Sequence, residues 1–300
     1  MPTEQEILKA IRKIIPDSKR YLFDDAAIIE KDLIVTTDTL VENTHFVQTP
    51  RRGISTTKTS TPEEIGWKAM AVNLSDIAAM GGKPLYALVS LSLTKNIKIK
   101  WVEDLYKGLI SCAKKYKTQI IGGNLTRSKE INITITIIGK TLVETPQRGA
   151  STRSTAKPGD LVFATGTFGD AAFKNYKIKI FPQINLGQKI VHLTKRAALM
   201  DASDGLADCL IQIADQSQVK IIVDEEKIPV SKNVNSLDIA LYGGEDYQLV
   251  GTASEITCKK LVKIKGIKII GKVIKGKGAF LKQNNRTIVK LDMKKAFKHF

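Results

Sequence analysis

The chain has 300 residues, of which 43% are hydrophobic and 26% are charged, and its formal net charge is +17. This length suits two domains and allows a substantial core, and the composition excludes a wholly disordered or collagen-like chain. The charge excess suggests nucleic acid or an acidic membrane surface as a partner. However, only nine of the 47 basic residues are Arg, the side chain that reads phosphate and guanine bidentately. A Lys-rich solvated surface is therefore the favoured interpretation.

Cysteine usage and the N-terminus indicate the compartment. Cys112, Cys209 and Cys258 are odd in number and far apart, which argues against a disulfide framework and for a reducing environment. The acidic, amphipathic N-terminus is not typical of a signal peptide, and no run approaches the roughly 18 apolar residues of a membrane helix. We therefore expect a cytoplasmic protein without a membrane partner.

The first half of the chain contains one strongly signalled helix, which begins at Thr61-Pro62 and runs to Met80. Thr61 is a typical N-cap, Pro62 suits the first helical position, and Gly81-Gly82 ends the helix. The other elements expected before residue 145 are helices at 5–15 and 101–117 and strands at 33–41, 85–93, 119–122 and 131–137.

A polar stretch at 144–159 contains both Pro and Gly and predicts a boundary between domains at 1–145 and 146–300. Helices alternate with strands on both sides of this stretch, which predicts a mixed α/β fold, of the α+β type, in two domains. The second half is expected to hold a strand at 161–166, a Gly-containing turn leading to a helix, the approach to a turn at 197–201, helices at 204–216 and 254–263, and strands at 219–224, 246–252, 267–274 and 279–282.

Two Asp residues lie where Asp is unfavourable for structure. Asp38 interrupts a strand pattern. Asp76 shares the apolar face of the long helix with Ile65, Ala69 and Val72, near a C-terminus whose dipole disfavours negative charge. A Lys partner or a solvated helix end would explain Asp76, and so would a metal ion.

Further Asp residues stand at the ends of elements in both halves. Asp24-Asp25 precede an apolar run, and Asp201 and Asp204 flank the start of a helix, where Asp204 reads most simply as an N-cap. Oxygen ligands with few His and isolated Cys indicate Mg²⁺ rather than zinc, and clustered Mg²⁺ usually accompanies phosphate chemistry. Two double glycines, in GGNLTR at 122–127 and GGED at 243–246, are either turns or loops that cradle phosphate.

Seven motifs occur in one order across nearly the whole chain: FDDAA, TTDTLVENTHF, GWKAMAVNLSDIAAMGGKP, IGGNLTR, STRSTAKPGD, DASDGL and YGGEDYQL. This pattern resembles the thiamine-monophosphate kinase family, in the superfamily that includes aminoimidazole ribonucleotide synthetase, and the match extends to the closing AFKHF. The resemblance implies transfer of the ATP γ-phosphoryl group to thiamine monophosphate with several Mg²⁺ ions. It also implies a homodimer whose N-terminal domains build a shared β-barrel, with active sites near the interface.

The resemblance assigns roles by motif position. Asn124 stands where the family's GGDTTR motif has a metal-binding Asp, so an amide oxygen replaces one negative charge. No catalytic general base is expected, because the acceptor is already a phosphate oxyanion. The implied contacts are Gly123, Asn124, Arg153 and Ser203 for ATP, His45, Glu245 and Phe297 for the thiamine substrate, and Asp25, Thr36, Thr37, Asp38, Asp76, Asn124, Asp201 and Asp204 for metal.

Three alternatives remain open at this stage. The chain could be another enzyme of the superfamily, closest to aminoimidazole ribonucleotide synthetase. It could be a basic nucleic-acid-binding protein, for which the Lys-dense stretch 259–277 is the only concentrated signal, although alternation of Lys with apolar residues is also typical of a strand with one solvated face. It could also be a non-catalytic homologue, which only Asn124 suggests.

Overall fold

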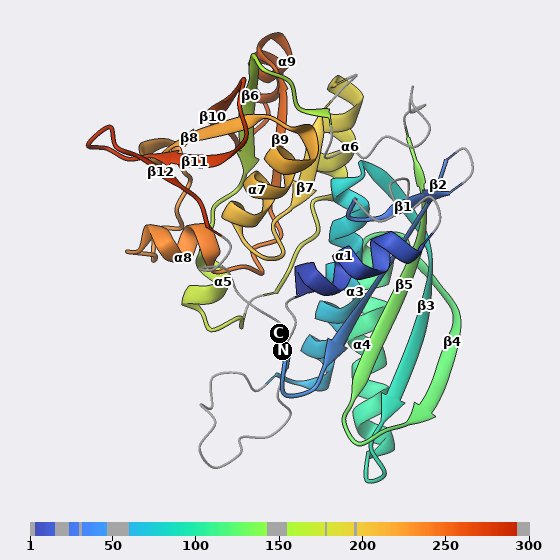
Figure 1. Ribbon diagram of the computed structural model, residues 1–300. Coiled ribbons are helices and arrows are strands. Elements are labelled where there is room, and N and C mark those ends of the chain that lie inside the picture. Colours follow the sequence, from blue (N-terminus) through green and yellow to red (C-terminus); the bar gives the residue numbers. More distant parts are fainter. Residues whose placement is uncertain are drawn as a thin grey trace.

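The computed structural model describes residues 4–15, 24–29, 32–46, 60–142, 155–177, 179–194 and 197–292. Two β-sheets organise this part of the chain, and Figure 1 shows them in two halves of the molecule that meet at helix α3. The five-stranded sheet has the order β1-β2-β5-β3-β4, and the seven-stranded sheet has the order β12-β11-β8-β10-β6-β9-β7. The mixed α/β architecture in two parts is therefore as predicted. The boundary within 144–159 stays a prediction, because 143–154 lie outside the described residues.

The first sheet combines antiparallel and parallel pairing. Strand β5 pairs antiparallel with β2 and β3, and β4 pairs parallel with β3 at the edge of the sheet. The elements of this half are α1 (Glu4–Ile14), β1 (Ala27–Ile29), β2 (Leu33–Val41), α3 (Pro62–Ala79), β3 (Gly82–Leu93), α4 (Ile99–Lys115), β4 (Gln119–Arg127) and β5 (Asn132–Thr141).

Helix α3 begins as the sequence predicts and is the central helix of the fold. The Thr61 hydroxyl accepts a hydrogen bond from the Glu64 N–H, and the Glu64 carboxylate accepts one from the Thr61 N–H, so both halves of a capping box are present. Helix α3 is buried on nearly all sides, because it packs on the first sheet and α4 and also contacts α6 and β7 of the second half. Residues on α3 are therefore held firmly at the junction of the two halves.

Two glycines allow the close packing of α3 on α4. An added Cβ at Gly66 would overlap the carbonyl oxygen of Leu105, and one at Gly108 would overlap the carbonyl oxygen of Glu63. Any larger residue would push the helices apart, so these glycines fix the distance between them.

The second sheet has β10 near its centre, between β8 and β6. Lys268 and Lys272 of β10 are exposed while Ile270 and Val273 are buried, so this part of the Lys-dense stretch is a strand with one solvated face. The elements of this half are β6 (Asp160–Thr165), α5 (Asp170–Phe173), α6 (Ile184–Leu193), β7 (Ala198–Asp201), α7 (Leu206–Ser217), β8 (Lys220–Asp224), the 3₁₀ helix η3 (Glu225–Lys227), α8 (Leu237–Tyr242), β9 (Leu249–Ser254), α9 (Glu255–Leu261), β10 (Ile267–Ile274), β11 (Gly278–Lys282) and β12 (Ile288–Lys290).

Several short elements differ from the sequence-based expectation. Residues 198–201, expected as the approach to a turn, form strand β7, because pairing with β9 decides their conformation. Strand β4 continues to Arg127 instead of ending at 122, so GGNLTR lies inside a strand. The elements β1, α6, α8 and β12 were not expected. Three of them, β1, α8 and β12, are only three to six residues long, which is too short to show a clear period.

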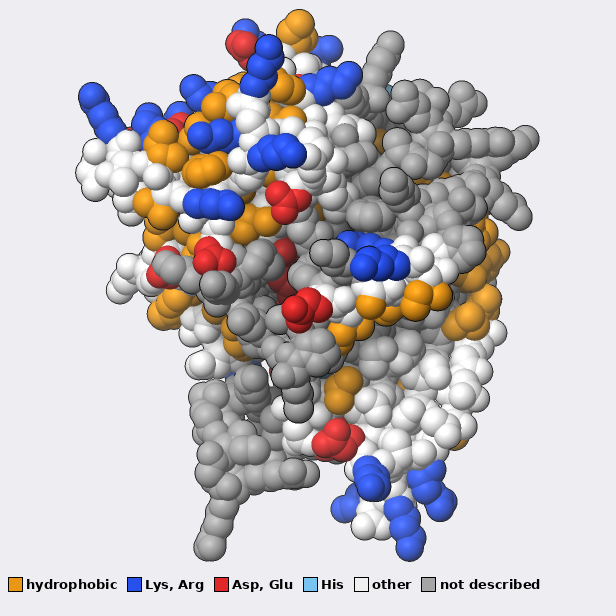
Figure 2. Space-filling model, in the orientation of Figure 1, with side chains coloured by type: hydrophobic (Ala, Val, Ile, Leu, Met, Phe, Trp, Pro, Cys, Tyr) orange, Lys and Arg blue, Asp and Glu red, His pale blue; other side chains and the backbone are white. Residues whose placement is uncertain are grey.

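On the face shown in Figure 2, the surface charge agrees with the interpretation of the composition as a Lys-rich solvated surface. Lys and Arg side chains are scattered over the second half and at the lower tip of the first, and several Asp and Glu side chains lie between them. Cys112, Cys209 and Cys258 are free and buried. Among the described residues, the helices are all too short or too polar to cross a bilayer.

Candidate active site

Three carboxylates from distant parts of the sequence converge at the junction of the two halves. Asp25, Asp76 and Asp201 each offer one oxygen atom, and these atoms lie within 4.8 Å of one another. Asp25 precedes β1, Asp76 lies in the last turn of α3, and Asp201 ends β7. The Asp residues that the sequence places at element ends in both halves therefore meet in one cluster.

Thr36 of β2 connects the members of this cluster. Its buried hydroxyl donates to Asp76 Oδ2 at 2.6 Å and lies 3.2 Å from the carbonyl oxygen of Asp25. Strand alternation puts Asp38 on the same face as Thr36 and puts Thr37 on the opposite face. The Thr37 hydroxyl donates to the carbonyl oxygen of Ile135 at 3.1 Å, so the Thr37 side chain does not join the carboxylate cluster in this chain.

Asn73 is a site residue that the sequence reading missed. It is fully buried on α3, where its side-chain oxygen accepts a hydrogen bond from the Asp38 N–H at 2.8 Å, and its amide donates to the carbonyl oxygen of Ala69 at 3.1 Å. Asn73 therefore holds the backbone of β2 at Asp38 against α3. An Asn on an otherwise apolar helix, one turn before Asp76, is the signal that could have revealed it.

Negative charge accumulates in this region. Burial raises the pKa of Asp76 well above the usual carboxyl range, and the carboxylates of Asp38, Asp201 and Asp25 raise it further, while the hydrogen bond from Thr36 lowers it. Repulsion of this kind costs free energy unless a cation or a proton compensates. The Asp76 surroundings therefore favour the metal-ligand interpretation over a Lys partner or a solvated helix end.

The same charges also act on the buried hydroxyl of Tyr247, which belongs to the second half of the chain. Burial raises its pKa most, and the carboxylates of Glu245, Asp38, Asp201 and Asp204 raise it further. The charges of Asp38 and Asp204 therefore act on one group, although these residues come from different halves of the molecule.

Two loops of the second half are held together beside the cluster. The Glu245 N–H donates to the carbonyl oxygen of Ser203 at 2.6 Å, and the Tyr247 N–H donates to that of Ala202 at 3.0 Å. Gly244 has a left-handed φ of 68°, and an added Cβ there would lie 2.8 Å from the Ser203 carbonyl oxygen. The simple N-cap interpretation of Asp204 is wrong, because Gly205, which has no side chain, occupies the N-cap position of α7.

Glu245 and His45, both expected on the substrate side, are joined by a lysine. The Lys68 ammonium lies 2.7 and 2.8 Å from the two carboxylate oxygens of Glu245 and donates to the carbonyl oxygen of His45 at 3.4 Å. The Val41 N–H donates to His45 Nδ1 at 2.9 Å, so in neutral His45 the ring proton lies on Nε2. Sequence reasoning did not identify Lys68, because one Lys among 38 carries no signal of its own.

Gly123 and Asn124 lie away from the carboxylate cluster within one chain. Across the sheet, Asp38 of β2 is aligned with Ile135 of β5, Val89 of β3 and Gly123 of β4. Neighbouring strands are about 4.8 Å apart, so β4 runs roughly 14 Å from β2. An added Cβ at Gly123 would overlap the Val89 carbonyl oxygen, which gives this glycine a packing role. Arg153 and Phe297 lie outside the described residues.

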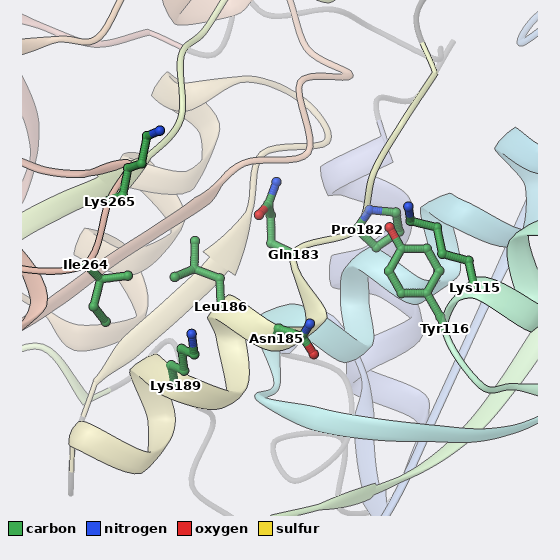
Figure 3. Close-up of a pocket in the computed structure, with 9 residues that line it drawn as sticks. All are labelled: Lys115, Tyr116, Pro182, Gln183, Asn185, Leu186, Lys189, Ile264 and Lys265. Atoms are coloured by element: carbon green, nitrogen blue, oxygen red, sulfur yellow. The ribbon is translucent and has the colours of Figure 1, made fainter.

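A cavity of about 660 Å³ lies apart from these residues, between the end of α4, the start of α6 and the turn after α9. Figure 3 shows Lys115 and Tyr116 on one side of it and Ile264 and Lys265 on the other. None of the residues assigned above by motif position lines this cavity. We therefore place the candidate active site at the carboxylate cluster and not in the cavity.

A protein-family model and two relatives of known name match this sequence. The sequence model for "AIR synthase related protein, N-terminal domain" matches residues 23–141. A thiamine-monophosphate kinase of Synechococcus elongatus is 32% identical and aligns with 99% of this chain and 96% of its own length. The enzyme of the same name from Bacillus subtilis is 36% identical, over 77% of this chain and 76% of its own length.

Solved structures agree with the sequence relatives. The structure of AaThiL complexed with AMPPCP and TMP has a TM-score of 0.83 and 30% identity, covering 99% of this chain and 97% of that one. The thiamine-monophosphate kinase of Stenotrophomonas maltophilia has a TM-score of 0.72 and 29% identity, covering 92% and 94%. A HypE-HypF complex, at 22% identity and a TM-score of 0.76, shows likeness of fold alone.

Proposed function

The chain belongs to the thiamine-monophosphate kinase family, and from this premise we propose that its carboxylate cluster is the phosphoryl-transfer site. The chain is an enzyme that phosphorylates thiamine monophosphate with ATP, giving thiamine diphosphate and ADP. The observation that carries the placement of the site is the convergence of Asp25, Asp76 and Asp201 within 4.8 Å from motifs of both halves. The AaThiL structure, which is complexed with AMPPCP and TMP, supports ATP and thiamine monophosphate as the ligands of this fold.

The donor set of the cluster fits Mg²⁺. Its candidate ligands are carboxylate oxygens, with no thiolate or imidazole among the three that converge, and hard oxygen ligands select Mg²⁺ over zinc. Asp25, Asp76 and Asp201 would hold Mg²⁺. Asp38, whose charge acts on Asp76, and Asp204, whose charge acts on Tyr247, would contact further ions. When bound, Mg²⁺ would offset the repulsion between two polyanionic substrates and neutralise charge that develops on the transferring group.

The protein groups around the cluster would bind and orient the substrates. The acceptor phosphate already carries a negative oxygen, so the chain needs no general base. His45 can donate from Nε2, since its Nδ1 accepts from Val41, and Glu245 presents a carboxylate on the same side. We assign these two residues and Phe297 to the thiamine substrate and Gly123, Asn124, Arg153 and Ser203 to ATP. Thr36 and the backbone of Thr37 stay proposed metal contacts.

A second copy of the chain would complete the site. Strand β4 is an open edge, with Ile121 50% exposed and Leu125 69% exposed, and neighbouring β3 exposes Tyr86 and Leu88. An exposed apolar edge of this kind is unusual in a monomer and is a template for pairing with another chain. We propose a homodimer in which the first sheets form a shared β-barrel and β4 of each copy brings Gly123 and Asn124 towards the carboxylates of the other.

Two related expectations go with this function. We infer that the protein acts in the cytoplasm, which its three free, buried cysteines support. The aminoimidazole ribonucleotide synthetase alternative is disfavoured, because relatives that match over 99% and 92% of the chain are thiamine-monophosphate kinases.

The function is tested by ADP release from ATP with thiamine monophosphate, with and without Mg²⁺. We expect release that requires both thiamine monophosphate and Mg²⁺. Release that is independent of thiamine monophosphate, or that requires a formylglycinamidine ribonucleotide instead, would exclude the kinase assignment. A gel-shift titration with DNA at increasing salt concentration addresses the nucleic-acid alternative, for which we expect no specific binding.

A further inference from the structure

Lys68 is unlike the other paired lysines of this lysine-rich chain. Its ammonium makes two short contacts with the Glu245 carboxylate, and the side chains of Lys68 and Glu245 are only 13% and 20% exposed. The lysines that pair with Asp104, Asp170 and Glu255 are 47–72% exposed. Exposed pairs contribute little, whereas a mostly buried charge pair is retained only where its geometry is good.

The position of this pair is informative. Lys68 lies on α3, two turns before Asp76, while Glu245 lies on a loop of the second half whose backbone is hydrogen-bonded to Ser203. The same ammonium reaches the carbonyl oxygen of His45, beyond the end of β2. Lys68 therefore joins three segments that are far apart in the sequence, and two of them carry the groups assigned to the thiamine substrate.

Glu245 depends on this contact for its orientation. Its φ of 57° is left-handed, a conformation that a residue with a side chain adopts only when its surroundings hold it. The Ser203 carbonyl oxygen fixes the backbone of Glu245, and Lys68 fixes its carboxylate. Without the ammonium, the carboxylate would be left mostly buried without its counter-ion and would turn towards water.

We propose that Lys68 is a positioning residue for the thiamine substrate, acting through the Glu245 carboxylate. This inference rests on the proposed function of the site. Lys68 sets the direction of the Glu245 carboxylate and thereby the affinity for thiamine monophosphate. It has no part in holding ATP, because the hydrogen bonds that its ammonium makes within the described residues go to His45 and Glu245.

The test uses steady-state kinetics of the full chain, with thiamine monophosphate and MgATP varied separately. For Lys68→Gln we expect the KM for thiamine monophosphate to rise about tenfold or more, with the KM for ATP changed less than about twofold. Lys68→Arg should recover most of the affinity, since a guanidinium can also donate to both carboxylate oxygens. Lys100→Gln, which removes an exposed lysine on α4 paired with Asp104, is the matched control and should leave both KM values unchanged.

A double variant separates positioning through Glu245 from any other role. If Lys68 acts through Glu245, Lys68→Gln added to Glu245→Gln should raise the KM for thiamine monophosphate no further. If Lys68→Gln alone does not fold, the KM of the double variant is still compared with that of Glu245→Gln. The double variant should fold, because it leaves neither charge buried. A further tenfold rise in the double variant, an unchanged KM in Lys68→Gln, or an equal rise in both KM values would overturn the inference. A wild-type protein that makes no thiamine diphosphate would instead refute the proposed function.

Discussion

Strands β2 and β4 belong to the same sheet but present their predicted ligand residues in different surroundings. On β2, Thr36 is buried under α3, and its hydroxyl is bonded to Asp76. On β4, Asn124 lies on an open edge where nearly every residue is exposed. The carboxylate part of the site is therefore assembled within one chain, and the glycine-rich part faces outward. We infer from this difference that the complete site needs two copies of the chain.

Helix α3 explains why the carboxylate part of the site is assembled within one chain. It carries Lys68, Asn73 and Asp76, and it packs on both sheets, so these side chains have little freedom. No helix among the described residues packs on β4 as α3 packs on β2 and β7. This is consistent with the proposal that a partner chain completes the site.

Among the variants considered, Asp38→Ala, in the carboxylate part of the site, should lower turnover the most. We expect turnover to fall by about 10²- to 10³-fold, the typical loss when one group that stabilises transferring charge is removed. The fold should persist, because the contact with Asn73 is made by the Asp38 backbone N–H, which the substitution keeps. Turnover with saturating MgATP and the melting temperature check both statements. A rate like that of the wild type would remove Asp38 from the site.

Leu125→Glu tests whether the open edge at β4 pairs with a second copy of the chain. The Leu125 side chain is 69% exposed, and in the proposed dimer a charge there would be buried against the partner. We expect the mass in solution to halve and turnover to fall by ~10²-fold, as expected for misplaced site groups. Mg²⁺ should still raise the melting temperature, because Asp25, Asp76 and Asp201 remain together. Val289→Glu, on the exposed edge strand of the other sheet, is the control and should change neither mass nor turnover.

Asp76→Asn tests the repulsion within the cluster. The folded pKa of Asp76 is raised, so without metal the folded protein binds more protons than the unfolded chain, and its stability falls as pH rises through that raised pKa. The variant should lack this fall and should be more stable than the wild type at neutral pH without metal, by about 1–3 kcal/mol. Its amide oxygen can still accept the hydrogen bond from Thr36. Melting curves in EDTA and in Mg²⁺ at several pH values would show this, and a variant that is less stable in EDTA would contradict it.

Asn124→Asp should have the smallest effect. It restores the charge that the family motif carries at this position, so the Mg²⁺ concentration for half-maximal activity should stay the same or fall by a few-fold. The measurement is turnover against Mg²⁺ at fixed substrates. Loss of activity in this variant would place Asn124 outside the metal site.

The sequence was sufficient for the parts of the fold and site that have a local signal. The N-cap residue Thr61 followed by Pro62, and the apolar, β-branched run at 33–41, predict their elements almost to the residue. Asp38 and Asp76 are conspicuous because Asp is unfavourable in a strand and near a helix C-terminus, so the sequence marks them as candidate site residues.

The rest depends on contacts between distant segments. Strand β7 forms because β9 pairs with it, and nothing within its four residues requires a strand. Lys68 and Asn73 become notable only when Glu245 and Asp38 are placed beside them. The double glycine at 122–123 predicts a turn or a loop that cradles phosphate, but the structure gives Gly123 a close approach to β3 inside a strand.

The central claim is that this chain transfers a phosphoryl group from ATP to the phosphate of thiamine monophosphate, at a carboxylate site that depends on Mg²⁺. Phosphorus NMR of the reaction mixture tests it most directly, because it follows donor and acceptor together. We predict that the diphosphate signals of thiamine diphosphate appear in step with loss of the ATP γ-phosphate signal, and that chelating Mg²⁺ stops both changes. Release of inorganic phosphate with the thiamine monophosphate signal unchanged would contradict the account.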